Sequence, residues 1–596
     1  MSNSSNKIRQ TVLCALFISA LTAKAQFRSY EIYQPQVTRG FIVDTSQNEL
    51  KYNHCTSIQR YRGRFYCFWN ANTVYKEGEP GQLLYMATSL DGMNWSEPVN
   101  WTPDNGRKQW QPCTINIDDE SLWVFWQETG GPFWFSKLTD PEGAWTHRMI
   151  FTKTMMPDGL EYNPAATQDP LRLSNGRICQ TVTWVQISGG PNKFSGIVYT
   201  NNGGQSFNMD TSSFVWDPID GTKSFESMLV EQYDGNIRMF IRNLDRTSQQ
   251  DELFMTSLGD ENAENFYSPA QFSKTRTVSS RCWVKTIGQR KIMLLNDSAN
   301  GTPELAGHDR KNIAMFFSRS GMDDFAAGVP VVDYEPELAY PQAVEHDNKL
   351  YFTYSHENSK NIRWGIVDPL PADDKYYIFP RGTDRRLTDH DDGPVEVRVE
   401  KFNLNGDSML RFYGNASAGV DIDICEPQND VLKIRLPVFL ESTPADKRMR
   451  LLCVGDGEVQ LGYDAATPYR YQVLIDDTWY DAGAFDPAKW NDILLIISSN
   501  GVATQNMGSA LYHPAPSGFN GRVYIGDGYP EEFLDETSRF IVNIERFGSL
   551  VEAASESGFC GDNEHPIISP DLNYDCIIDL YDFSIMAKSW LKDADK

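Results

Sequence analysis

The sequence predicts an all-β protein, with a six-bladed β-propeller followed by a β-sandwich or jelly-roll domain and a small α-helical tail. Three observations predict this class. A unit of about 57 residues occurs six times in the first part of the chain, short alternating strands fill the next part, and the last segment changes to acidic residues before an apolar helix. A repeated unit built from short strands is typical of propeller blades.

Composition and charge restrict the possible functions. The chain has 596 residues, of which 40% are hydrophobic and 12% aromatic, and this indicates a folded protein of several domains. The net charge of −26 argues against nucleic acid as a partner, because phosphate binding needs a basic patch. An anionic sugar is still compatible, since a few arginines in one pocket can dominate the local field.

Residues 1–25 are predicted to be a secretory signal peptide. Lys7 and Arg9 precede an apolar run, and Ala23-Lys24-Ala25 forms a small-residue cleavage site. Cleavage after Ala25 would give a secreted, extracellular protein. We expect no membrane span, because the apolar run is too short for a stable transmembrane helix and no other segment is a candidate.

Residues 26–372 are expected to form the propeller. Six strand openings recur in steps of 57 to 59 residues, once of 55, and a second hydrophobic run follows each opening. Residues 26 to about 50 could complete the last blade and so close the ring, which removes exposed sheet edges. The blades are expected at residues 51–100, 108–155, 162–210, 224–260, 279–327 and 338–370.

Three turns within these repeats share a pattern of Ser or Thr, then Asp, Asn or Ser, then Gly, and finally an aromatic residue. They lie at residues 89–95, 200–207 and 318–325. In such a turn the polar side chain accepts hydrogen bonds from nearby N–H groups, Gly supplies a positive φ, and the aromatic ring fills the blade. We expect these residues to be structural rather than catalytic.

The second half of the chain predicts a different architecture. The run from about residue 368 to 386 is rich in Pro and Asp, and residues 373–386 are interpreted as a linker. Residues 387–552 alternate polar and apolar side chains over short strands separated by Gly and Pro, which predicts an antiparallel β-sandwich or jelly roll. A lectin-like accessory role and a purely structural role are both open for this domain.

The residues that open the six inner strands are candidates for a functional site, because inner strands line the axis of a propeller. All six are polar or ionisable, so we predict that they face one pocket; polar side chains facing solvent are the alternative. Asp169 is a further candidate beside one of them. The six are His54, Gln111, Gln168, Glu226, Arg281 and Tyr340.

Residues 50–372 resemble the sialidase-like, BNR-repeat superfamily of six-bladed propellers. The resemblance lies in blades such as ESMLVEQYDGNIRMFIRN and AYPQAVEHDNKLYFTYS, and in the three turns, which are similar to Asp boxes. It implies that Tyr340 is a nucleophile assisted by Glu226, with Glu79 as the carboxylate nearest to the acid/base position and His54 as another candidate acid.

The resemblance also implies arginines that hold a substrate carboxylate. The Phe/Tyr-Arg-Ile-Pro motif that carries the first arginine of that family is missing, and Arg39 is the only early substitute. The predicted substrate-binding residues are Arg242, Arg281, Arg310, Gln111, Gln168 and Asp169.

The resemblance implies a secreted, exo-acting glycoside hydrolase for a polysaccharide or glycan with acidic sugars. A Tyr with a pKa of about 10 is a poor nucleophile and needs a Glu to take its proton, while an acid protonates the leaving oxygen. No cofactor is expected for catalysis. A propeller lyase for uronate-containing glycans, with His54 or Tyr340 as base, and a non-catalytic glycan-binding propeller are the alternatives.

Residues 558–596 carry a possible metal site. Acidic and amide residues recur there at the ligand spacing of an EF-hand-type calcium loop, followed directly by an apolar helix. The segment resembles a single dockerin repeat, which implies calcium binding and a cohesin-like or cell-surface partner. The predicted ligands are Asp571, Asn573, Asp575, Ile577 through its backbone carbonyl, Asp579 and Asp582.

Overall fold

The computed structural model describes most of the chain between residues 27 and 553. The predicted signal peptide and the predicted calcium-binding tail lie outside the described residues. Within these ranges the chain forms strands, turns and loops, and there is no helix that could cross a membrane. The described ranges are 27–156, 159–187, 193–216, 225–243, 253–276, 280–296, 310, 312–332, 335, 337–380, 398–413, 416–426, 428–442, 448–455, 457–464, 466–467, 469–506, 510–519, 521–526 and 539–553.

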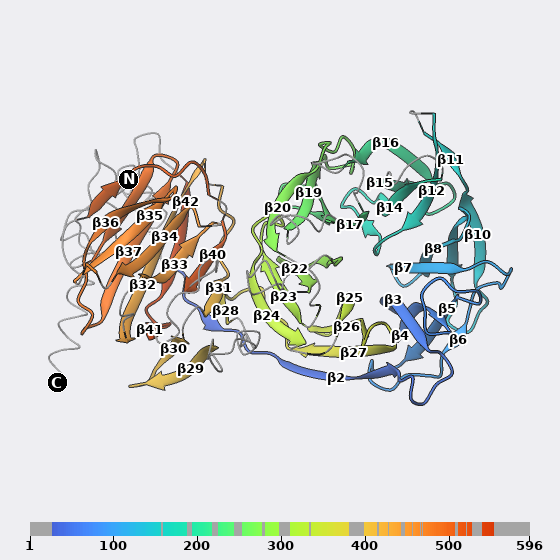
Figure 1. The fold of residues 1–596 in the computed structure, drawn as a ribbon, viewed down its shortest axis with the longest axis horizontal. Coiled ribbons are helices and arrows are strands. Elements are labelled where there is room, and N and C mark those ends of the chain that lie inside the picture. Colours follow the sequence, from blue (N-terminus) through green and yellow to red (C-terminus); the bar gives the residue numbers. More distant parts are fainter. Residues whose placement is uncertain are drawn as a thin grey trace, which may run out of the picture.

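Six of the sheets surround a common centre and form the blades of a propeller (Figure 1). This confirms the predicted all-β class and the six-bladed ring. The first three blades contain β3 (Tyr52–Tyr61), β4 (Arg64–Asn72), β5 (Leu83–Ser89) and β6 (Val99–Asn100); β7 (Gln109–Ile117), β8 (Ser121–Glu128), β9 (Phe133–Leu138) and β10 (Thr146–Phe151); and β11 (Thr154–Met155), β12 (Glu161–Ala166), β13 (Leu171–Arg172), β14 (Ile178–Gln186), β15 (Lys193–Thr200) and β16 (Asn208–Val215).

The last three blades have the same antiparallel order. They contain β17 (Phe225–Glu231), β18 (Ile237–Arg242), β19 (Leu253–Gly259) and β20 (Gln271–Arg276); β21 (Trp283–Ile287), β22 (Arg290–Leu295), β23 (Ile313–Ser318) and β24 (Ala326–Val332); and β25 (Ala339–His346), β26 (Lys349–His356), β27 (Asn361–Asp368) and β2 (Gln36–Val43).

The ring is closed by an early strand pairing with a late one. β2 pairs antiparallel with β27, from Gln36 opposite Asp368 onward, and Figure 1 shows it running along the edge of the ring to that sheet. This confirms that the lead-in segment completes the last blade. Glu335 forms ion pairs with Arg39 on β2 at 2.8 Å and with Arg363 on β27 at 2.7 Å. Arg39 thus helps to hold β2 in the last blade.

Aromatic and aliphatic side chains fill the spaces between neighbouring blades. Trp123 and Phe125 of the second blade share one hydrophobic cluster with Val182 and Trp184 of the third, and all four are almost completely buried. Because a middle strand of a blade packs against both neighbouring blades, both of its faces are apolar, and this explains sequences such as RFYCFW. Each large side chain buried in this way contributes roughly 1.5–3 kcal/mol.

The three predicted turns fix the connection within their blades. Asp91 accepts hydrogen bonds from the backbone N–H groups of Met93 at 2.9 Å and Asn94 at 2.8 Å, and these hold the pKa of its carboxyl well below the usual range. Asn202 accepts from the N–H of Ser206 at 3.0 Å in the same way. In the third turn the carboxylate is Asp324, which accepts from the Ser318 hydroxyl. The structural role expected for the turns is confirmed.

The remaining described strands form a second unit, called here the C-terminal unit. One sheet contains β1 (Glu31–Ile32), β28 (Tyr377–Pro380), β31 (Ser417–Val420), β40 (Val523–Gly526), β33 (Arg448–Val454), β34 (Val459–Asp464), β35 (Arg470–Ile475) and β36 (Thr478–Ala484). The other contains β29 (Arg398–Leu404), β30 (Asp407–Tyr413), β41 (Arg539–Asn543), β32 (Asp430–Ser442), β37 (Asn491–Ser498), β38 (Gly501–Gln505), β39 (Leu511–His513) and β42 (Gly548–Ala553).

Side chains from both sheets contribute to a single hydrophobic core, with Phe412 and Leu432 from one sheet and Leu461 and Val473 from the other. The start of the interpreted linker is not a free connection. Its residues 377–380 form β28, which pairs with β1 and β31 inside the first sheet.

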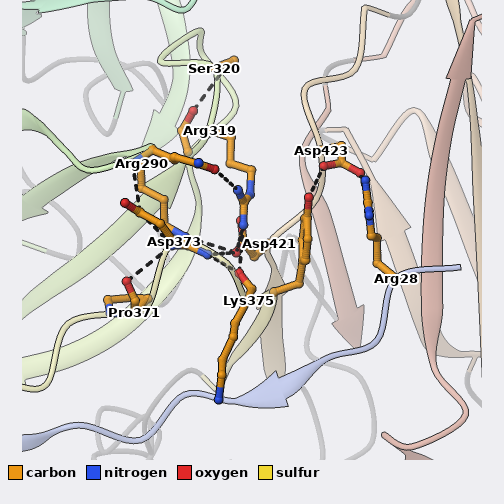
Figure 2. Close-up of polar contacts among 12 residues, drawn as sticks. Arg28, Arg290, Arg319, Ser320, Pro371, Asp373, Lys375, Asp421 and Asp423 are labelled. Carbon is orange, nitrogen blue, oxygen red and sulfur yellow. Dashed lines mark hydrogen bonds and ion pairs between the residues drawn. The ribbon is translucent and has the colours of Figure 1, made fainter.

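The propeller and the C-terminal unit are joined by a buried ion-pair cluster (Figure 2). Arg290 and Arg319 of the fifth blade both contact Asp421, which follows β31, with N···O distances of 2.7 and 2.9 Å. The three side chains are only 2%, 8% and 3% exposed. Phe317 stacks on Phe379 beside this cluster, with ring centroids 4.1 Å apart.

Candidate active site

Four inner strands contain a β-bulge near their start, and in each case one non-glycine residue adopts a positive φ. The register shifts lie between His54 and Ser57, Trp110 and Cys113, Phe225 and Ser227, and Ala339 and Gln342. The residues with positive φ are Cys55 (57°), Gln111 (49°), Glu226 (48°) and Tyr340 (58°).

This conformation costs an L-residue roughly 1–2 kcal/mol. Strain of this kind persists where the surrounding structure enforces it, and it is found preferentially at functional sites. A bulge also changes the direction in which a side chain points. The bulges therefore turn side chains from four blades away from the regular pleat and toward one another.

Tyr340 and Glu226 are joined through Arg242, at the end of β18. One guanidinium nitrogen, Nη1, donates to the Tyr340 hydroxyl at 2.8 Å and to Glu226 Oε2 at 2.6 Å. Gln111 donates to the other oxygen of Glu226 at 3.3 Å. Within the described part of the chain, the phenol and the carboxylate are thus linked by a shared arginine and not by a direct hydrogen bond.

The Tyr340 ring is surrounded by three arginines and a histidine. The guanidinium carbon of Arg281 lies 4.0 Å from the ring centroid, that of Arg310 5.4 Å and that of Arg242 5.9 Å. The His54 ring stacks at a tilt of 33°, with centroids 4.5 Å apart. This set is called here the Tyr340 cluster, together with Glu226, Gln111 and Cys55, which packs against Tyr340.

Burial and the arginines together determine the charges in the cluster. Burial raises the pKa of the Tyr340 phenol, and Arg242, Arg310 and Arg281 oppose this rise. Burial alone would raise the pKa of Glu226, but Arg242 and Arg281 outweigh it, so that the pKa is lowered and the carboxyl is ionised. The resting site therefore holds a neutral phenol, one carboxylate and three guanidinium groups.

His54 is placed in the cluster, but its environment does not suit an acid. Burial, followed by the charges of Arg281 and Arg310, lowers the pKa of its imidazole well below the ordinary value. Its Nδ1 contacts the hydroxyls of Ser355 at 3.0 Å and Ser359 at 2.9 Å. A neutral imidazole is a poor proton donor at neutral pH, so this environment does not favour His54 as the acid.

The structure does not bring Glu79 to the cluster. Glu79 forms an ion pair of 2.7 Å with Lys76 in the loop between β4 and β5, and this contact lowers the pKa of its carboxyl. Glu77 of the same loop is the carboxylate that interacts with the site. Glu77 as a whole residue is exposed, but the pKa of its carboxyl is raised. Desolvation is the largest cause of the rise and the charge of Glu226 adds to it, while a hydrogen bond with Tyr52 opposes it.

Two other predicted residues lie in the walls between the blades. Gln168 donates to the backbone carbonyl of Cys282 at 2.7 Å and accepts from Gln342. Asp169 accepts from the Ser57 hydroxyl at 2.6 Å and the Thr114 N–H at 2.8 Å, and burial raises the pKa of its carboxyl. Both side chains connect blades through these hydrogen bonds, none of which is with Tyr340 or Glu226.

The described residues contain no group of three or more His, Cys, Asp or Glu side chains that could hold a metal ion. The six predicted calcium ligands, Asp571 to Asp582, lie outside the described residues, so this result does not bear on them.

Two residues of the site, Cys55 and Glu77, were not predicted from the sequence. Cys55, and not its neighbour His54, occupies the bulge position equivalent to Gln111, Glu226 and Tyr340. Glu77 was missed because Glu79 lies in the same loop and nothing in the sequence VYKEGEPGQ says which carboxylate points inward. Tyr52, two residues before His54 on β3, is the hydrogen-bond partner of Glu77, and its place near the start of an inner strand could have suggested a position in the site.

The six sheets form a propeller with a cluster of Tyr, Glu and Arg side chains at its centre. In agreement, residues 63–352 match a family model described as a BNR repeat-like domain. No curated protein matches the sequence.

Several solved structures are similar in fold. They include a mutant of Trypanosoma rangeli sialidase displaying trans-sialidase activity (12% identity, TM-score 0.49) and the T. rangeli sialidase in complex with sialic acid (12%, 0.47). Each alignment covers 87% of this chain and 96% of the other. A protein of unknown function from Dyadobacter fermentans aligns over 56% of this chain and 99% of its own, with 12% identity and a TM-score of 0.45.

Proposed function

We propose that the protein is an exo-acting glycoside hydrolase for glycans that carry acidic sugars, with Tyr340 as the nucleophile. The observation that supports this most strongly is the linkage of Tyr340 and Glu226 through Arg242, surrounded by further arginines. A phenol beside a carboxylate has the composition of an activated nucleophile. The excess of positive charge in the cluster suits a substrate with a carboxylate or sulfate group.

The proposed reaction has two displacement steps. In the first, the Tyr340 oxygen bonds to the anomeric carbon as the bond to the leaving oxygen breaks; Glu226 takes the phenolic proton and Glu77 protonates the leaving oxygen. In the second, Glu77 removes a proton from water, which attacks the anomeric carbon, and the Tyr340 oxygen leaves and regains its proton from Glu226. The anomeric configuration is retained.

The charges of the cluster fit an anionic substrate in particular. Arg310 is partly exposed and Arg242 lies at the hydroxyl of Tyr340, so both are placed to pair with a substrate anion. Such an anion would compete with Glu226 for Arg242 and thereby raise the basicity of Glu226. A neutral phenol also approaches an anionic sugar without the repulsion that a carboxylate nucleophile would meet.

Glu77 has the properties needed for the acid/base. Its raised pKa favours the protonated form that donates to the leaving oxygen, and its exposure leaves it accessible to the departing sugar and to water. Tyr52 holds the carboxyl through a hydrogen bond, and Gly78 next to it packs on the Trp110 ring, since a Cβ there would lie 3.0 Å from that ring.

Product analysis on sialylated, uronate-rich and sulfated glycans tests this function. The wild type should release a saturated sugar with a new reducing end. Glu77→Gln should reduce the rate by about 10²- to 10⁴-fold, as expected for loss of an acid/base. Glu79→Gln, a matched control in the same loop, should retain the wild-type rate.

The other outcomes distinguish the alternatives. An unsaturated product would show a lyase, in which His54 or Tyr340 would act as the base. Binding of a glycan without any product would show a recognition module. Equal rates for Glu77→Gln and the wild type would remove Glu77 from the mechanism.

We further propose that the protein is secreted after cleavage at Ala25 and that the tail, residues 558–596, binds calcium and a cohesin-like or cell-surface partner. The spacing from Asp571 to Asp582 supports calcium binding. For the C-terminal unit we propose a β-sandwich with an accessory role; the core shared by its two sheets supports this.

A further inference from the structure

We propose that Arg281 activates Tyr340 by stabilising its phenolate across the face of the ring, and that it does not serve to hold the substrate anion. This inference rests on the proposed function for its catalytic meaning. The geometry that carries it, a buried guanidinium stacked on the nucleophile, stands without that function. Arg281 is thus a positioning residue that acts through Tyr340.

The first observation is that Arg281 is a buried charge with no carboxylate partner among the residues that the structure describes. Its residue is 2% exposed, one nitrogen donates to the backbone carbonyl of Thr167, and its buried Nε has no hydrogen-bond partner within the described part of the chain. Two other buried arginines form ion pairs, Arg242 with Glu226 and Arg290 with Asp421. An unpaired buried charge is costly and is retained where it has a function.

The second observation is where this charge lies. The guanidinium carbon is 4.0 Å from the centroid of the Tyr340 ring, which makes Arg281 the nearest of the three arginines to that ring. A cation over an aromatic face is attracted by the ring even when the phenol is neutral. The attraction grows when the phenol loses its proton, because a full negative charge then faces the guanidinium at short range.

The third observation is that the three arginines differ in their contacts and in their exposure. Arg242 reaches the phenolic oxygen and Glu226, and Arg310 is partly exposed, so these two are placed to meet a substrate anion. Arg281 donates a hydrogen bond to the Thr167 carbonyl, and its charge favours the ionised forms of both Tyr340 and Glu226. It therefore acts on the charge that develops on the phenolic oxygen.

Nitration of tyrosine tests this without any substrate, because tetranitromethane reacts with the phenolate. The rate at Tyr340 would be measured by peptide mass spectrometry at one mildly alkaline pH, relative to the exposed Tyr267. Arg281→Gln should raise the pKa of Tyr340 by about 1 to 3, the usual effect of losing an opposite charge at this range. The nitration rate of Tyr340 should then fall about 10- to 1000-fold.

Two variants control this experiment. Arg281→Lys keeps the charge and should restore part of the nitration rate. Arg177→Gln removes another arginine stacked on a tyrosine, 4.2 Å from the Tyr199 ring, and should leave the rate at Tyr340 unchanged. Circular dichroism would confirm that each variant is folded.

Equal nitration of Tyr340 in the wild type and in Arg281→Gln, including no reaction in either, would overturn the inference. With a cleaved glycan in hand, Arg281→Gln should lower kcat about tenfold or more with little change in KM. A raised KM with unchanged kcat would instead assign Arg281 to the substrate anion. If no glycan is cleaved, the proposed function fails while the nitration result still decides the role of Arg281.

Discussion

At the scale of single residues, Arg242 connects the two groups that the proposed reaction requires to cooperate. Its Nη1 binds both the Tyr340 hydroxyl and a Glu226 oxygen, and its side chain is 7% exposed. The buried ion pair between Arg242 and Glu226 also contributes to the stability of the folded protein. Removing one partner leaves a buried charge uncompensated, which is more harmful than never having buried the pair.

Glu226→Gln should therefore lower the free energy of unfolding by about 3 kcal/mol at neutral pH. The pKa of Glu226 is lowered in the folded protein, so its stabilisation is complete above the ordinary value of 4.5 and is lost as the pH falls through the folded-state pKa. Urea unfolding at neutral pH and at progressively lower pH should show the difference between variant and wild type shrinking below that value.

Glu335→Gln is the matched control for this prediction. Glu335 also pairs with two arginines, Arg39 and Arg363, but the side chains are 17% to 32% exposed, so the loss should be about 1 kcal/mol or less. A difference for Glu226→Gln that stays constant down to low pH would contradict the electrostatic account.

At the scale of elements, the site depends on bulges in the inner strands. Gln111 adopts a φ of 49°, a conformation that β-branched residues strongly avoid and that glycine adopts freely. Its side chain contributes one long hydrogen bond to Glu226. The backbone strain at this position should therefore be visible in thermal stability.

Gln111→Gly should leave the melting temperature unchanged or raise it slightly, because relief of strain offsets the entropy that glycine adds to the unfolded chain. Gln111→Val should lower stability by more than about 1 kcal/mol. Differential scanning calorimetry of the two variants measures this. A variant order with Val more stable than Gly would show that the positive φ is not maintained in the folded protein.

The elements also show what the sequence could and could not predict. The repeat spacing predicted the six blades, and the lead-in predicted the closing strand β2, because hydrophobic periodicity is a local signal. The bulges were not predictable, since no glycine marks Cys55, Gln111, Glu226 or Tyr340 and their conformation is imposed by neighbouring blades. For the same reason the sequence pointed to Glu79, while the orientation of its loop brings Glu77 to the site.

At the scale of the whole molecule, the propeller and the C-terminal unit share a buried ionic contact at Asp421 (Figure 2). Asp421 lies 131 residues from Arg290 and 102 from Arg319 in the sequence, and no local pattern couples them. The sequence therefore predicted two separate units with a linker, but not the contact that holds them together.

Asp421→Asn should lower the free energy of unfolding by about 3–5 kcal/mol, because Arg290 and Arg319 would both lose a charged partner in a buried site. Asp423→Asn is the control. Asp423 pairs with Arg28 at 3.1 Å, and the Arg28 side chain is 49% exposed, so the free energy of unfolding should fall by less than about 1 kcal/mol. Calorimetry measures both. Equal effects of the two substitutions would contradict a buried ionic joint.

The proposed reaction requires that Tyr340 bonds covalently to the sugar. The most direct test uses Glu77→Gln with an aryl glycoside of the acidic sugar found in the product analysis, because the aryl group leaves without an acid while the second step lacks its base. After rapid acid quenching, peptide mass spectrometry should find one glycosyl group on Tyr340. No adduct, or an adduct on another residue, would contradict the claim.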